Sequence, residues 1–161
     1  MLSNMPKSVF NGLAVLTVAI PVLAWSNLLP VHNVRSSAIR YFEETDHRKN
    51  KDKSVNHTVA SGHATFSWQE GTLQSFGNLR VHTKADTFEL KLVRTTSASA
   101  NELSGEWDVY KNGDPTCAGC KGSIYVTSPG EGFHDLKGQV DNGNVGYSFY
   151  GELDPHTRYD Y

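Results

Sequence analysis

The chain has 161 residues, of which 38% are hydrophobic and 20% are charged, and its formal net charge is −2. This length suits one ordinary domain, and the small net charge gives no electrostatic reason to expect nucleic acid as a partner. Two cysteines are too few to staple a small disulfide-rich fold, so the core must come from apolar packing.

The chain begins with an apolar run, residues 9–24, that follows the cation Lys7. A positive start, an apolar stretch and small residues before a cut describe a secretory signal, here with cleavage ahead of Trp25. Apolar character continues to Val31, and a run of roughly 20 residues can span a bilayer. We therefore expect residues 1–24 to form an apolar helix that is a signal peptide or, alternatively, a membrane anchor. Either function makes the rest of the chain secreted or periplasmic, or tethers it outside the cytoplasm.

Residues 25–62 are polar and charged, which predicts a linker. A short helix is expected over residues 38–42, capped by Ser36 or Ser37. In residues 43–53 the charges alternate in sign without apolar periodicity, as is typical of a solvated segment. Asn56, His57 and Thr58 form an N-glycosylation sequon, which has meaning only in a eukaryotic secretory pathway.

From residue 63 onward, apolar and polar residues alternate with a period of two. Alternating runs occupy residues 63–69, 79–84, 88–92, 106–110, 123–127, 135–140 and 147–153, with a weaker run at 73–76. Turn pairs such as Asn112-Gly113 stand between the runs. The pattern predicts an all-β antiparallel meander of about eight strands in residues 63–161, forming a small barrel or sandwich. A closed barrel is favoured because eight short strands close around a filled interior.

Aromatic side chains are prominent on the predicted inner faces of these strands. They are Phe66, Trp68, Phe88, Trp107, Tyr147 and Phe149. These side chains either line a cavity for an apolar ligand or simply fill the core. The predicted outer faces are polar, the reverse of an outer-membrane barrel, so we expect a domain that folds in water.

The most specific short motif is Cys117-Ala118-Gly119-Cys120, in a turn-rich loop between two predicted strands. In an exported protein we expect a small disulfide that rigidifies this loop. A redox-active pair is one alternative, although no helix is predicted whose N-terminus would activate a thiolate. A zinc half-site is another, with His134 and His156 as the ligands to test. Lys121 stands where haem attachment requires histidine, and we predict neither a metal nor a cofactor.

The sequence shows no convergent catalytic constellation. His63 and His82 point outward on the alternation, and neither a phosphate-binding loop nor a nucleophile elbow is present. We therefore expect an exported or membrane-tethered binding or accessory module, with an apolar small molecule or a protein as its partner. The alternatives from the enzyme class are thiol-disulfide exchange at Cys117 and Cys120, and an isomerase or cyclase working in an apolar barrel cavity.

Overall fold

The computed structural model describes residues 29–48, 50–126, 135–155 and 158–160, and every regular element in them is a β-strand. The strands are β1 (Val31–Ser36), β2 (Ala38–Asp46), β3 (Lys53–His57), β4 (Val59–Gln69), β5 (Ser75–Thr83), β6 (Thr87–Ala98), β7 (Glu102–Lys111), β8 (Asp114–Val126), β9 (Asp135–Asp141), β10 (Val145–Glu152) and β11 (Arg158–Asp160). Within these residues, no helix is long and apolar enough to cross a membrane. The helix expected in residues 1–24 lies outside the described residues.

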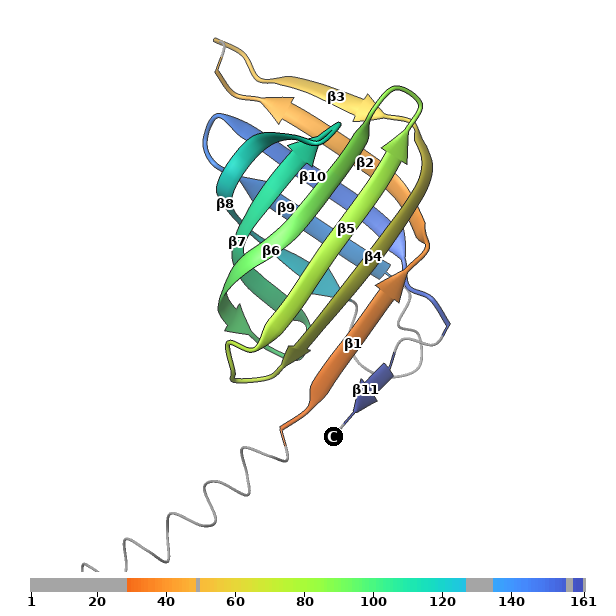
Figure 1. Ribbon diagram of the computed structural model, residues 1–161, viewed down its shortest axis with the longest axis vertical. Coiled ribbons are helices and arrows are strands. Elements are labelled where there is room, and N and C mark those ends of the chain that lie inside the picture. The colour runs from red at the N-terminus through yellow and green to blue at the C-terminus, as the bar shows by residue number, and fades with distance from the viewer. Residues whose placement is uncertain (1–28, 49, 127–134, 156–157, 161) are drawn as a thin grey trace, which may run out of the picture. The chain divides into compact units, whose positions relative to one another are not determined.

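The described strands form one antiparallel sheet, with the order β11-β1-β4-β5-β6-β7-β8-β9-β10-β2-β3. From β4 to β10 each strand pairs with the next one along the chain, so this part is a meander (Figure 1). The all-β antiparallel prediction is confirmed. It succeeds because one face of each strand is buried, which imposes a period of two on the sequence. Residues 75–76 of the run predicted at 73–76 and residues 79–83 of the run predicted at 79–84 belong to a single strand, β5.

The sheet is curled but not closed, so the predicted closed barrel is wrong, and so is the two-sheet sandwich. In the described residues the pairing order is linear, with β11 at one end and β3 at the other. Strands β1 and β2 are separated by Ser37 alone, yet β1 pairs with β4 and β2 pairs with β10. The covalent chain of residues 31–46 thus joins the two ends of the meander, where a closed barrel would have a hydrogen-bonded ladder.

The switch from one end of the meander to the other is held by side chains at the β1–β2 bend. Ser36 Oγ donates to the Glu152 carbonyl oxygen at 2.5 Å, and the Ser37 amide donates to Asp154 Oδ1 at 2.8 Å. Just beyond the bend, Ile39 of β2 packs on Gly62 of β4. A Cβ atom at Gly62 would lie 2.7 Å from Ile39 Cγ1. The absence of a side chain therefore lets β2 approach β4 closely.

The predicted polar linker is wrong over the residues that the structure describes. Residues 31–62 form β1, β2, β3 and the start of β4, and the short helix expected at 38–42 is instead the beginning of β2. Ile39 and Phe42 are buried there, and Phe42 lies opposite Phe149 in the ladder with β10. Pairing with a strand about a hundred residues away determines this conformation, and it overrides a local pattern that is rich in charge.

Candidate functional site

Five polar side chains from five strands gather at the end of the sheet where β2 joins β3. They are Glu44 of β2, His57 of β3, Lys111 of β7, Thr116 of β8 and Tyr147 of β10. We call this group the mouth cluster. Hydrogen bonds link Glu44 to His57 and Lys111, and another links Tyr147 to Thr116. The cluster lies against aromatic side chains of the core.

Strand register brings the charged members to the inner face. Residues directly opposite each other in an antiparallel ladder share one face of the sheet. His57 lies opposite the buried Phe42, and Lys111 lies opposite the buried Phe88. Glu44 lies opposite Tyr147, whose ring is also buried. The inner face therefore continues past its last apolar residues into a set of charged and polar groups.

Glu44 is the centre of the charged part of the cluster. Its Oε1 atom lies 3.1 Å from Lys111 Nζ and 3.1 Å from His57 Nε2. The Glu44, Lys111 and His57 side chains are 21%, 32% and 11% exposed. This partial burial strengthens the interaction of Lys111 with Glu44 relative to a fully hydrated ion pair.

Aromatic rings lie beneath these charges. The Lys111 ammonium is 5.4 Å from the centroid of the Phe88 ring, and the His57 ring is 4.9 Å from the same ring, centroid to centroid. Phe42 packs against Phe88 with centroids 4.6 Å apart. A cation over an aromatic face is attracted by the ring quadrupole, so Phe88 also helps to hold Lys111 in place.

Tyr147 connects the mouth cluster to β8. Its hydroxyl donates to Thr116 Oγ1 at 2.8 Å, and Thr116 Oγ1 donates to the Val109 carbonyl oxygen at 3.3 Å. Burial raises the pKa of the Tyr147 phenol above its ordinary value, and the negative charge of Glu44 raises it further against the opposing hydrogen bond to Thr116. Tyr147 is therefore a neutral hydrogen-bond donor across the physiological range.

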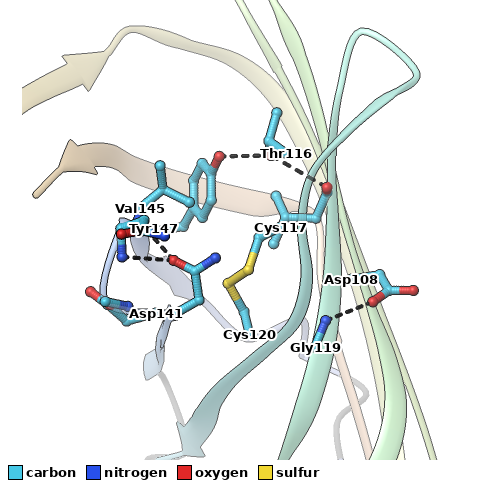
Figure 2. Close-up of a disulfide and its surroundings, with 12 residues drawn as sticks. Asp108, Thr116, Cys117, Gly119, Cys120, Asp141, Val145 and Tyr147 are labelled. Atoms are coloured by element: carbon cyan, nitrogen blue, oxygen red, sulfur yellow. Dashed lines mark hydrogen bonds between the residues drawn. A yellow bond between two sulfur atoms is a disulfide. The ribbon is translucent and has the colours of Figure 1, made fainter. Parts of the chain in front are cut away.

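The disulfide lies next to Thr116, as Figure 2 shows. Cys117 and Cys120 are bonded to each other and are 3% and 0% exposed. Cys117 lies opposite Val109 and Cys120 lies opposite Trp107, so the residues between the cysteines bulge out against Asp108 alone. Gly119 in this bulge has φ +68° and donates its amide to Asp108 Oδ1 at 3.0 Å. The cysteines thus staple a β-bulge inside β8, not a loop between strands as predicted.

All six aromatic residues predicted to line a cavity are buried, with exposed fractions between 0% and 3%. Phe66 packs against Trp107 with ring centroids 6.0 Å apart, and Phe88 packs against Tyr147 with centroids 6.1 Å apart. Of the six, Phe88 and Tyr147 contribute to the mouth cluster or its floor. A ligand cavity bounded by these rings stays a prediction.

The ligands suggested for a zinc site, His134 and His156, lie outside the described residues. Within the part of the chain that the structure describes, no group of three or more histidine, cysteine, aspartate or glutamate side chains is arranged to hold a metal ion.

Comparison with known proteins gives no relative for this chain. No protein-family model matches it, and neither a curated protein nor a solved structure is similar enough to match.

Reasoning from the sequence missed Glu44, His57 and Lys111. Glu44 and His57 were assigned to the linker, and Lys111 follows the last apolar residue of its alternating run. A usable signal was present, because Lys111 follows Val109 by two residues and Glu44 follows Phe42 by two. Extending the period of two past the last apolar residue places both charges on the inner face.

Proposed function

We propose that this protein is a small binding module whose ligand site is the mouth cluster and the aromatic rings beneath it. The observation that carries the proposal is the convergence of Glu44, His57 and Lys111 on one point over the Phe88 ring. Ligand sites are commonly apolar surfaces with a few polar groups that fix orientation. The ligand that suits this arrangement has an apolar, preferably aromatic, body and a charged or hydrogen-bonding group that faces Lys111 and Glu44.

An export signal at residues 1–24 completes the proposal, so the module works outside the cytoplasm or tethered to its membrane. The disulfide supports this location, because disulfides persist in oxidising compartments and are rare in the cytosol. Burial of both cysteines argues against thiol-disulfide exchange as the activity, since a redox-active pair must be reached by its partner thiol.

A second candidate function is proton transfer by an isomerase or cyclase. It is favoured by the contact between His57 Nε2 and Glu44 Oε1 at 3.1 Å, since an imidazole oriented by a carboxylate can act as a general acid or base. In this function the module would release its bound molecule chemically altered.

The first test is a native mass spectrum of the protein purified from its own host. A discrete extra mass that is lost on denaturation supports a carried ligand. The denatured mass also shows whether residues 1–24 have been removed.

The site itself is tested by titration with 1-anilinonaphthalene-8-sulfonate, an anion with an aromatic body. We expect binding to the native protein and a loss of affinity of about tenfold in Lys111→Met. Lys91→Met is the matched control, because Lys91 also lies 5.4 Å from a ring, that of Tyr110, and near a carboxylate, that of Glu89, but on the outer face. Equal losses in the two variants, or no loss in Lys111→Met, would contradict the assignment of the site.

A further inference from the structure

His47, the residue that follows β2, connects two turns of the sheet. Its Nδ1 atom lies 3.0 Å from Oδ1 of Asp52, in the β2–β3 turn. Its Nε2 atom lies 2.7 Å from Oδ2 of Asp141, at the end of β9. Its backbone amide donates to the carbonyl oxygen of Asn144, in the β9–β10 turn, at 2.8 Å. One residue therefore ties the tip of the β2–β3 hairpin to the neighbouring β9–β10 turn.

Gly146 of β10 makes room for this connection. It lies opposite Asp141 on one side and opposite Thr45 on the other, so it separates Asp141 from His47. A Cβ atom at Gly146 would collide with the Asp141 carboxylate and would lie 3.3 Å from His47 Nε2. The Asp141–His47 contact therefore crosses β10 at a position without a side chain.

Both ring nitrogens of His47 face carboxylate oxygens, and only the protonated imidazolium can donate from both. A neutral imidazole donates from one nitrogen and turns a lone pair toward the second carboxylate. The hydrogen bonds to Asp52 and then Asp141 accordingly raise the pKa of His47 above its ordinary value.

The other charged groups around His47 leave its two carboxylate contacts intact. Arg48 is bonded to Asp46, with Nε 3.0 Å from Oδ1. His47 and Glu43 both border a shallow surface depression, and Glu43 accepts a hydrogen bond from the Tyr41 hydroxyl.

Two further titratable groups lie near Asp141 and His47. Lys121 of β8 lies opposite Asp141 in the β8–β9 ladder and is exposed. Tyr147 also borders the depression, and its hydroxyl bonds to Thr116.

Among the described strands, β3 pairs with β2 alone, so no other strand shares a backbone ladder with it. The hairpin carries Glu44 and His57, two members of the mouth cluster. We propose that His47 is a proton-operated latch that holds the β2–β3 hairpin against the β9–β10 turn and so limits opening of the mouth cluster. The effect on the mouth cluster rests on the proposed function, whereas the latch itself does not.

The direction of the pH effect follows from linkage. Because the pKa of His47 is raised in the folded protein, the latch contributes fully below the ordinary histidine value of about 6.5. Its contribution is lost as the pH rises through the raised pKa. The hairpin is therefore held in mild acid and released in mild alkali.

The test is amide hydrogen exchange of the full-length protein, followed by NMR at about pH 5.5 and about pH 8.5. The readout is the protection factor of the β3 amides, which is the exchange rate corrected for the intrinsic rate at each pH. We expect protection of β3 to fall about twofold to fivefold at the higher pH in the native protein, the size expected for loss of one exposed ion pair. His47→Gln should show the low protection at both values, and so should Gly146→Ala, which displaces Asp141.

His82→Gln is the matched control, because His82 Nδ1 bonds to the neutral Thr87 hydroxyl at 3.1 Å. This variant should keep the pH dependence of β3. The latch is overturned if β3 protection is independent of pH in the native protein. It is also overturned if the pH dependence survives in His47→Gln, since a group other than His47 would then cause it.

The same variants, titrated with 1-anilinonaphthalene-8-sulfonate, separate the latch from the proposed function. If the probe does not bind the native protein at either pH, the proposed site fails and hydrogen exchange still decides the latch. If the probe binds and β3 protection is insensitive to His47, the site stands and the latch fails.

Discussion

Lys111 Nζ lies 3.1 Å from Glu44 Oε1, although 67 residues separate the two along the chain. The pair joins β7 to β2, two strands that are not neighbours in the sheet. Neither side chain is more than a third exposed, so each charge is held near the apolar rings of the core with the other as its main compensation. We therefore expect the Lys111–Glu44 pair to contribute measurably to the free energy of unfolding.

Removing both partners of this pair should cost less than the two single removals added together. We expect Glu44→Gln and Lys111→Met each to lower the free energy of unfolding by about 1 to 2 kcal/mol, because the remaining charge is partly buried without its partner. The double variant should lose less than the sum of the two. Urea denaturation of the four proteins measures this coupling.

The control for this cycle is the ion pair between Arg40 and Glu152, which also links β2 to a neighbouring element but is more than half exposed at both ends. Its coupling free energy should be below about 0.5 kcal/mol. Similar coupling in the two cycles would mean that burial does not strengthen the Lys111–Glu44 pair.

The disulfide should stabilise the fold and should resist reduction in the native state. Replacing Cys117 and Cys120 together with alanine should lower the free energy of unfolding by roughly 2 kcal/mol, the loop-entropy value for so short a ring. In the native protein, the bond should not be reduced by dithiothreitol and trapped by iodoacetamide on a timescale of minutes, because both cysteines are buried. Rapid trapping of the reduced cysteines without unfolding would instead support thiol-disulfide exchange as the function.

Gly138 distinguishes a filled core from a ligand cavity beside Phe149. The two residues lie opposite each other, and the Phe149 ring covers Gly138 so closely that a Cβ atom would collide with it. In a filled core, Gly138→Ala should cost about 1 to 3 kcal/mol by overpacking. The cost should fall by more than half in a Phe149→Leu background, which removes the ring. If Phe149 borders an empty cavity, the ring can move away and Gly138→Ala should be close to neutral in thermal and urea denaturation.

Some features of the fold could be predicted from individual residues of the sequence. Ala64, Phe66 and Trp68 alternate with polar residues because one face of β4 is buried, and each of the three is buried as that pattern predicts. The Asn112-Gly113 turn was equally legible, since Asn112 has φ 54° and Gly113 has φ +85°. These features depend on contacts between near neighbours, which leave a local trace in the sequence.

Other features could not be predicted, because the local composition of the sequence favoured a different structure. Residues 43–53 were predicted to be a solvated segment of the 25–62 linker because they are rich in charge. The structure instead places Glu44 and His57 on the inner face of β2 and β3. The cysteines were predicted to lie in a loop because glycine and proline surround them. In the structure they join the two sides of a bulge within β8. In both cases, the partner strand supplies the hydrogen bonds that the local sequence does not specify.

The sequence by itself determined the fold class, the inward set of aromatic residues and turns such as Asn112-Gly113, because each follows from alternation or from backbone preferences within a few residues. Only the tertiary structure decided that the sheet stays open, since this depends on Ser36 and Ser37 redirecting the chain from β4 to β10. The same holds for the mouth cluster and the His47 latch. Their members are far apart in the chain, and the register of non-adjacent strands alone brings their charges within a few ångströms.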